Sequence, residues 1–152
     1  KLSILDNDKI RTIAKVESSD AIKVAVPDNA IFPLHAGAAS KLLICQLSDS
    51  KLNKLLDENL PKYTKNTITD KEELKKELMT INIKKISFDN MEHSKNVKAV
   101  ALPILDKRNR IIAAISCPFF SDDIEIQKNE EIINDIKKVC SEISKRLNYF
   151  NK

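Results

Sequence analysis

The chain has very little glycine, no tryptophan and no long run of apolar residues. Gly37 is the only glycine among the 152 residues. Hydrophobic residues make up 42% of the sequence and charged residues 32%, and the apolar runs are too short to cross a bilayer. We therefore expect one soluble globular domain with its own hydrophobic core, rather than a disordered or membrane-spanning chain.

Cysteine is also scarce. Cys45, Cys117 and Cys140 are odd in number and form no CxxC pair, so the sequence excludes a disulfide framework and a structural zinc cluster. Their apolar surroundings predict reduced, buried thiols in a cytoplasmic protein. The chain opens at Lys1 on a strand pattern, without a signal sequence, and we expect it to be a fragment of a longer protein.

The net charge of +4 and the pI near 8.9 do not indicate a nucleic-acid surface. Lys and Glu alternate along 71–78, which is typical of a solvated helix face. No stripe combines arginine with aromatic residues. We therefore expect no direct contact between this segment and nucleic acid.

Apolar spacing predicts the order of the elements. In the first half we expect a hairpin over 2–18 with its turn at 6–8, and then a strand over 21–26 ended by Pro27 and Asp28. Three helices are expected to follow, the first from near Ala36 to 47 and the second over 50–59, capped by Ser48. The third covers 70–82, and its capping box is Thr69 with Glu72. The second half is expected to hold a strand over 86–89, a hairpin over 97–120 and a long helix with an apolar stripe from Ile132 to Leu147.

This order indicates an α+β fold in one domain. Hairpins dominate the predicted strands, so we expect a mostly antiparallel sheet of about six strands with helices laid against it and a long closing helix. No repeat, low-complexity tract or internal linker interrupts the chain.

The segment PLHAGAASKLL (33–43) gathers the smallest residues of the chain at the start of a predicted helix. The first amides of a helix lack helical acceptors, and small side chains let the carboxylate of a ligand reach them. The alternative is that Gly37 and the neighbouring alanines only allow close packing against the sheet. The residues alone leave both interpretations open.

Four segments taken in order resemble a known family. They are FPLHAGAASKLL (32–43), NTITDKEELKKEL (66–78), ISFDNMEH (86–93) and VKAVALPILDKRNRIIAAIS (97–116). They are similar to the PLHA, TIT(D/S), (Y/F)-x-D-(D/N)-E and hairpin motifs of the effector-binding domain of IclR-type transcriptional regulators. The resemblance implies a GAF-like domain over 1–152 that holds a small-molecule effector. It also implies an upstream winged helix-turn-helix domain, absent from this chain, through which alone the protein would bind DNA.

The resemblance also implies which residues would contact the effector. The family's ligand-binding amides fall on Ala38 and Ala39, and Ser40 stands where the family usually has glycine. Phe32 falls on an apolar pocket wall. The family's pocket acid falls on Asp89, and the family's hydroxyl donor to the ligand carboxylate falls on Ser116. From the residues alone, Asp89 would equally suit a turn or a cap, and Ser116 would be an ordinary strand serine.

Two positions depart from the family pattern. Ala99 stands where the family often has Cys or Ser, and Pro118 where it has a second serine. Because two side-chain donors are missing, we expect a larger or less polar effector than glyoxylate or pyruvate. Asn96 replaces a common glycine, and asparagine tolerates the left-handed conformation that the turn needs.

Catalysis and metal binding are not expected. The spacing of His35 and His93 with Cys117 or Asp89 matches no ligand pattern, so we expect structural histidines, no metal and no cofactor. Cys45 lies in an apolar helical run, where burial raises the pKa of a thiol and makes a Cys45–His35 nucleophile inert.

The sequence therefore predicts a cytoplasmic, non-enzymatic sensor of a small organic acid. The resemblance implies a homodimer or homotetramer without a membrane partner. The alternative function is a GAF-like dimerisation or interaction module with a degenerate pocket, filled by Phe32, Phe88 or Phe119.

Overall fold

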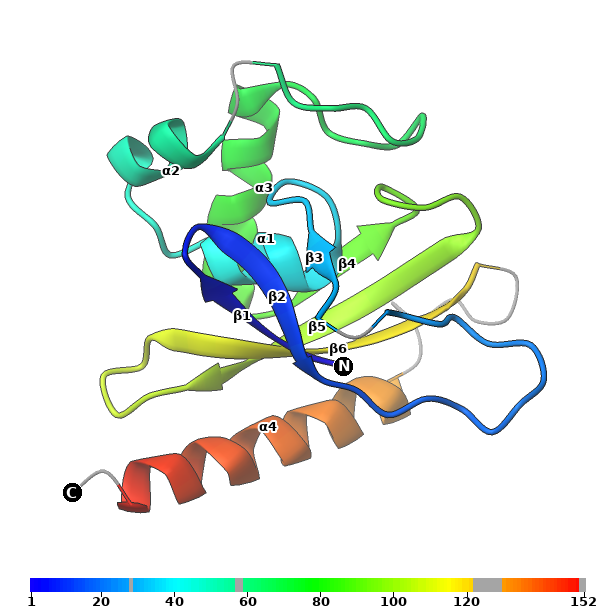
Figure 1. Ribbon diagram of the computed structural model, residues 1–152. Coiled ribbons are helices and arrows are strands. Elements are labelled where there is room, and N and C mark those ends of the chain that lie inside the picture. The colour runs from blue at the N-terminus through cyan, green and yellow to red at the C-terminus, as the bar shows by residue number, and fades with distance from the viewer. Residues whose placement is uncertain (28, 57–58, 122–129, 151–152) are drawn as a thin grey trace.

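A six-stranded antiparallel sheet forms the centre of the molecule (Figure 1). The computed structural model describes residues 1–27, 29–56, 59–121 and 130–150. The strands run in the order β3-β2-β1-β6-β5-β4. They are β1 (Leu2–Asp6), β2 (Lys9–Ala14), β3 (Ile31–Phe32), β4 (Ser87–Asn90), β5 (Val97–Leu105) and β6 (Ile111–Phe120). The predicted α+β fold and the size of its sheet are confirmed.

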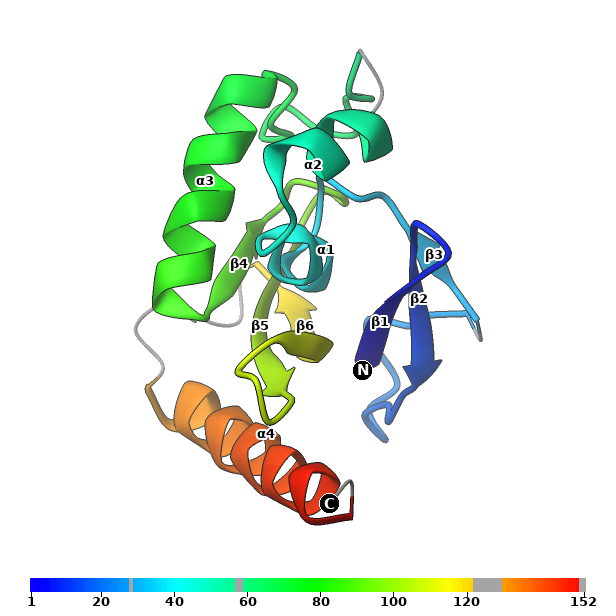
Figure 2. The same ribbon diagram turned by 90° about the vertical axis from the view of Figure 1, so that its left-hand side faces the viewer.

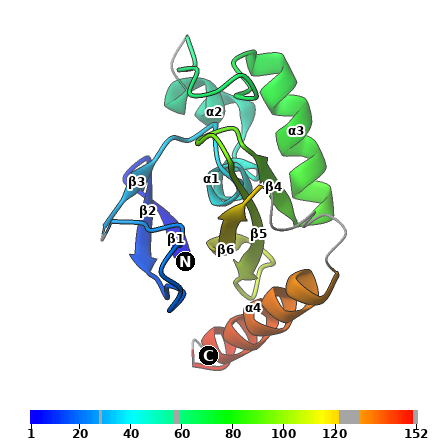
Figure 3. The same cartoon turned by 90° about the vertical axis from the view of Figure 1, so that its right-hand side faces the viewer.

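Helices cover both faces of the sheet. They are α1 (Ala38–Ile44), α2 (Asp49–Leu55), α3 (Lys71–Lys84) and α4 (Glu130–Phe150). The sheet curls around α1, with β1–β3 on one side of this helix and β4–β6 on the other (Figures 2 and 3). The long helix α4 crosses the opposite face of β5 and β6, and α3 packs outside α1. Within the described residues, no helix is long and apolar enough to span a membrane.

The central hairpin of β5 and β6 separates two apolar cores. On one face, Ala99, Ala101 and Ala114 belong to the core around α1. On the other face, Val100 and Ile104 belong to the core beneath α4. Both faces are covered, which explains the nearly continuous apolar sequence of this hairpin. The small alanines on the α1 side let this short helix lie close to the strands.

Two predicted turns adopt left-handed backbone. In the first hairpin Asn7 and Asp8 have φ values of 47° and 62°, as a two-residue type I′ turn requires. Asn96, at the position where glycine is common in similar sequences, has a φ of 61°. Asparagine and aspartate tolerate this region better than other residues, so both expectations hold.

The strand predicted over 21–26 is wrong. The partner of β2 at this edge is β3, where Ile10 pairs with Phe32, and Ala30 O accepts a hydrogen bond from Thr12 N–H at 3.1 Å. The edge of β2 is therefore occupied by 30–32. Residues 21–26 form no strand: Ile22 stays 80% exposed, while Val24 and Val26 are half-buried. Three residues of the predicted elements lie outside the described residues. They are Asp28, which was expected to end the strand, and Asp57 and Glu58 of the predicted second helix.

Helix α3 begins one residue later than its predicted capping box. Asp70, not Thr69, is the N-cap, because Asp70 Oδ1 accepts a hydrogen bond from Glu73 N–H at 2.7 Å. The predicted apolar face is correct, and its members Leu74, Leu78 and Ile81 are buried. Ser48 caps α2 as expected, with its hydroxyl accepting from Lys51 N–H.

The cap assignment predicts different effects of neighbouring substitutions. Asp70→Ala removes the cap acceptor and is expected to lower the free energy of unfolding by about 1 kcal/mol. Thr69→Ala, the matched control, is expected to change it by less than about 0.5 kcal/mol. Urea unfolding followed by circular dichroism measures both. A larger loss in Thr69→Ala than in Asp70→Ala would contradict the assignment.

Candidate functional site

A cavity of about 190 Å³ lies between the start of α1, the strands β4–β6 and residues 24–27. Its walls include all eight residues predicted from the sequence as ligand contacts: Phe32, Ala38, Ala39, Ser40, Asp89, Ala99, Ser116 and Pro118. These residues come from five different elements, so only the folded chain brings them together. Lys1, Ser3, His93 and the segment 24–27 also line the cavity, and the sequence did not single them out as contacts.

The start of α1 forms one wall of the cavity. The helix begins at Ala38 rather than near Ala36, and its first hydrogen bond runs from Lys41 N–H to Gly37 O at 3.1 Å. The amides of Ala38, Ala39 and Ser40 therefore have no acceptor within the helix. Gly37 has a φ of 103°, and an added Cβ would meet its neighbours only at ordinary contact distances. Its backbone conformation, rather than lack of space, makes glycine necessary there.

Asp89, at the end of β4, brings a buried carboxyl group to the cavity. Its side chain is 7% exposed, and Asp89 Oδ1 accepts a hydrogen bond from Glu92 N–H at 2.7 Å. Burial raises the pKa of this carboxyl group, while that hydrogen bond and the nearby Lys41 and His93 act in the opposite direction. Asp89 therefore caps the turn and also lines the cavity, so the two alternative interpretations of this residue are compatible.

Ser116, on β6, presents a hydroxyl group that lacks a partner. The residue is 1% exposed, and among the described residues Ser116 Oγ has no hydrogen-bond partner. A buried hydroxyl in this state destabilises the protein by about 1–3 kcal/mol unless another molecule satisfies it. Ser116 lies on the wall of the cavity.

Ala99 and Pro118 form an apolar wall together. They face each other in the register of β5 and β6, so the two departures from the expected donor pattern are adjacent in space. Phe32 lies on another wall, with its ring centroid 5.4 Å from that of His93. Phe88 and Phe119 pack against the core beneath α4, on the other face of the sheet. These two rings therefore do not fill the cavity.

Lys1 and His93 add ionisable groups that the sequence did not mark as effector contacts. Lys1 Nζ lies 3.6 Å from the centroid of the Phe32 ring. Burial lowers the pKa of the Lys1 side chain to about 8, although Asp89 partly opposes this effect. Burial also lowers the pKa of His93. His93 ends the quoted segment ISFDNMEH, close to Asp89, whereas Lys1 precedes every quoted segment and is 88 positions from Asp89, so only the fold reveals the place of Lys1.

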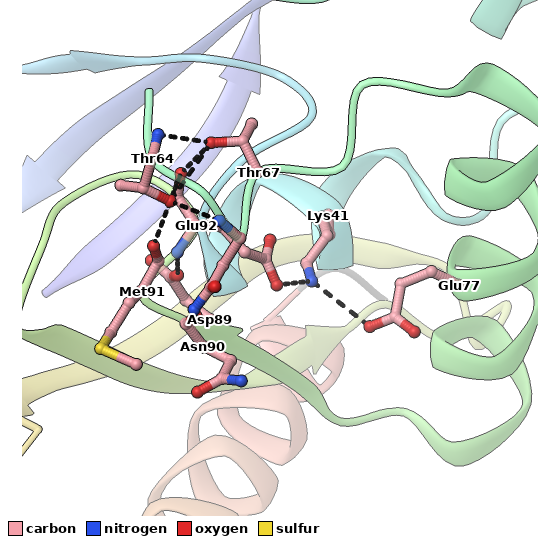
Figure 4. Close-up of polar contacts among 9 residues, drawn as sticks. Lys41, Thr64, Thr67, Glu77, Asp89, Asn90, Met91 and Glu92 are labelled. Atoms are coloured by element: carbon pink, nitrogen blue, oxygen red, sulfur yellow. Dashed lines mark hydrogen bonds and ion pairs between the residues drawn. The ribbon is translucent and has the colours of Figure 1, made fainter. Parts of the chain in front are cut away.

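A buried ion pair ties α1 to the turn after β4, so it fixes the segments that carry the cavity amides and Asp89 (Figure 4). Lys41 Nζ, on α1, lies 2.7 Å from Glu92 Oε1 and 3.3 Å from Glu77 Oε1 on α3. The Lys41 side chain is 1% exposed, and burial raises the pKa of Glu92 while Lys41 opposes that shift. Thr64 and Thr67 donate hydrogen bonds to Met91 O and Glu92 O respectively, at 2.6 Å each. The turn after β4 is thus tied to α1 and to the 64–67 loop.

The cysteines and His35 are occupied elsewhere. Cys45 Sγ donates to Leu42 O, and burial raises the pKa of its thiol to about 11, as expected for an inert cysteine. His35 Nε2 is hydrogen-bonded to Pro61 O at 2.8 Å. Cys140 is buried, but Cys117 is only half-buried, which corrects the prediction for that residue. In the part of the chain that the structure describes, no three His, Cys, Asp or Glu side chains cluster as metal ligands.

Comparison with known proteins identifies the family. Residues 1–145 match the family model described as the C-terminal domain of the bacterial transcriptional regulator IclR. The chain belongs to the IclR family. The resemblance stated from the four sequence segments is therefore confirmed, and the family's relatives are transcriptional regulators rather than enzymes.

Individual relatives agree with this IclR-family assignment. The chain is 28% identical over 145 residues to the acetate operon repressor of Salmonella typhimurium, a match that covers 91% of this chain and 53% of the repressor. The crystal structure of the IclR protein of Thermotoga maritima matches with a TM-score of 0.85 and 28% identity, over 97% of this chain and 60% of the other. The chain thus spans about half the length of the curated relatives it matches.

One solved structure with a similar fold contains a ligand. It is a double mutant of the inducer-binding domain of the PobR transcription factor from Acinetobacter, in complex with 3-hydroxybenzoic acid. It matches with a TM-score of 0.82 and 20% identity, over 94% of this chain and 85% of that domain. At this level of identity the match shows that the IclR-family fold is shared.

The buried ion pair predicts a large loss of stability in Lys41→Met. This change leaves the Glu92 carboxylate buried without its partner, and we expect the free energy of unfolding to fall by about 3–5 kcal/mol. Glu77→Gln, which removes only the longer and half-exposed contact, is expected to lose at most about 1 kcal/mol. Urea unfolding measures both variants. Equal losses in the two variants would rule out a dominant Lys41–Glu92 pair.

The raised pKa of Asp89 predicts a pH-dependent gain in Asp89→Asn. Asparagine keeps the Oδ1 acceptor for Glu92 N–H but never ionises. In the wild type, the folded state favours the protonated carboxyl group, so stability is lost as the pH rises through the raised pKa. We therefore expect the difference in Tm, variant minus wild type, to increase from about pH 4 to pH 8. A difference that decreases over this range would contradict the prediction.

Proposed function

We propose that residues 1–152 are the effector-binding domain of a bacterial transcriptional regulator. The domain binds a small organic acid in the cavity beside α1 and thereby alters DNA binding by an N-terminal winged helix-turn-helix domain. Membership of the IclR family supports this function, and so does the length of the relatives, which is about twice that of this chain. The named relatives include repressors, but the direction of regulation does not follow from the site.

The observation that carries the proposal is the unpartnered Ser116 hydroxyl in a cavity with other polar groups. The amides at the start of α1 lack helical acceptors, and Asp89 offers a carboxyl group on another wall. A ligand carboxylate accepts hydrogen bonds from the hydroxyl and the amides. Asp89 then accepts one from a ligand hydroxyl or hydrated carbonyl. Such a ligand satisfies groups that otherwise remain unpaired in the fold.

The size and polarity of the cavity favour an effector with an apolar body. The wall formed by Ala99 and Pro118 offers no side-chain donor, and Phe32 adds an aromatic surface. The volume of about 190 Å³ lies below that of pockets for drug-sized ligands, roughly 300–1,000 Å³, and suits a metabolite. We propose a larger or less polar acid than glyoxylate or pyruvate. The aromatic acid bound by the PobR domain is an example of this class.

Binding regulates DNA affinity only when the ligand prefers one of two arrangements of the protein. The full-length protein is proposed to act as a homodimer or homotetramer, in which the spacing of paired DNA-binding domains differs between the two arrangements. The alternative, an interaction module with a filled pocket, receives no support from the packing. Phe88 and Phe119 lie on the opposite face of the sheet, and Phe32 lines the cavity without closing it.

A ligand panel tests the site. The acids are pyruvate, benzoate and 3-hydroxybenzoate, and the Tm is measured with and without each. The proteins are the wild type, Asp89→Ala and, as a control, Asp135→Ala at an exposed position of α4. We expect the benzoates to raise the Tm of the wild type and the control by a few degrees, and pyruvate to have little effect. Asp89→Ala should lose most of the shift with 3-hydroxybenzoate, because the ligand hydroxyl loses its acceptor.

Three outcomes would contradict different parts of the proposal. Stabilisation by pyruvate without stabilisation by either benzoate would overturn the expected size and polarity. Failure of every acid to shift the Tm of the wild type would overturn the binding of such acids. Equal shifts in wild type and Asp89→Ala would remove Asp89 from the site while leaving the cavity as the binding site.

A further inference from the structure

Strand β1 brings the side chain of Lys1 to the cavity. Ser116 N–H donates a hydrogen bond to Lys1 O at 2.9 Å, so Lys1 lies directly beside the serine with the unpartnered hydroxyl. The alternation of a strand then places Lys1 and Ser3 on the cavity side. Leu2 and Ile4 point to the other face and pack in the core beneath α4. The backbone of β1 therefore fixes which way Lys1 points.

The ammonium group of Lys1 is held near an aromatic ring but not by an acid. Lys1 Nζ lies 3.6 Å from the centroid of Phe32, in the range of a cation–π contact. Among the described residues, no carboxylate oxygen lies within the 4 Å of an ion pair with this nitrogen. By contrast, the more deeply buried Lys41 has two carboxylate partners. Lys1 is thus a partly desolvated cation whose anionic partner the described residues do not supply.

The remaining ionisable groups around Lys1 are of both signs. Asp89 and His93 face Lys1 across the cavity. Asp89 acts to raise the pKa of Lys1, and Lys1 acts to lower the pKa of His93. Asp89 attracts the ammonium group yet is itself a buried carboxyl group. A second carboxylate on a ligand would therefore meet repulsion at the Asp89 side of the cavity.

We propose that Lys1 determines the specificity of the cavity for negative charge, by pairing its ammonium group with the carboxylate of the effector beside the Ser116 hydroxyl. The ligand class is a monocarboxylate with an apolar body and a hydroxyl group that reaches Asp89. This inference rests on the proposed function and deepens it, because it predicts that the cavity rejects neutral isosteres and dicarboxylates. Phe32 keeps the ammonium group in place when the cavity is empty and covers the apolar part of the ligand when it is full.

Isothermal titration calorimetry on the chain of residues 1–152 tests the role of charge. The probes are 3-hydroxybenzoate, its neutral amide 3-hydroxybenzamide, and the dianion isophthalate. For the wild type we expect 3-hydroxybenzoate to bind at least about tenfold more tightly than either other probe. Lys1→Met should weaken 3-hydroxybenzoate about ten- to hundredfold and leave the amide unchanged. Lys1→Arg should retain most of the affinity, and Lys145→Met on exposed α4 is the matched control.

The pH dependence provides a measurement that a purely structural role would not affect. The pKa of Lys1 is about 8, so the protonated form that pairs with an anion is lost as the pH rises above this value. Wild-type affinity for benzoate should therefore fall between pH 7 and pH 9, whereas that of Lys1→Arg should stay constant. A bound anion moves the fall to higher pH but does not reverse it.

Each result decides between the inference and the function on which it rests. Equal affinities of wild type and Lys1→Met for 3-hydroxybenzoate would overturn the role of Lys1 while leaving the cavity as an effector site. Equal affinities of the wild type for acid and amide would have the same meaning. No binding of benzoate or 3-hydroxybenzoate to the wild type would overturn the proposed function and this inference together.

Discussion

The ammonium group of Lys41 is the interaction on which the arrangement of the domain depends. A charge that is 1% exposed is tolerated only when it is paired, and Glu92 supplies the close partner at 2.7 Å. Because Lys41 belongs to α1, Glu77 to α3 and Glu92 to the turn after β4, one cation joins three segments that are distant in the sequence. Every residue of α1 is buried, so this short helix has no solvent-facing side along which it could shift.

The same turn that neutralises Lys41 also builds the cavity. Asp89 Oδ1 receives the Glu92 amide at 2.7 Å, and two threonines hold the carbonyl groups of Met91 and Glu92. Met91 has a φ of 60°, which a residue without glycine's freedom adopts only when its surroundings impose it. The position of the Asp89 carboxyl group is therefore fixed by contacts on both sides of the turn. The turn that pairs the charge of Lys41 therefore also places the Asp89 carboxyl group in the cavity wall.

The sequence predicts those parts of the fold that local patterns encode. The hairpins, the apolar face of α3 and the long closing helix follow from periods of two and of 3.6 residues. The error at α3 has a simple cause: Thr69 and Asp70 are each followed three residues later by a glutamate, so two capping boxes compete. The strand of two residues at 31–32 is too short to show any period. Residues 21–26 alternate like a strand, but the edge of β2 is occupied by β3.

The candidate site was predictable only in part, for a related reason. Residues within recognisable segments, such as Asp89 and Ser116, are found by resemblance to a family. Lys41 lies on a helix where a lysine usually faces water, and nothing in its neighbours marks it as buried. Lys1 precedes every quoted segment and reaches the cavity only because β1 pairs with β6. Side chains that depend on distant strand pairing leave no signal in the local sequence.

The two sides of the cavity also differ in how firmly they are held. On one side, displacement of α1 would expose the buried Lys41 and break its pair with Glu92. On the other side, residues 24–27 alternate between half-buried and exposed, and Lys15 Nζ donates a hydrogen bond to Val26 O. The segment whose alternation resembled a strand therefore lines the cavity as irregular backbone, while the wall that carries Asp89 belongs to the sheet.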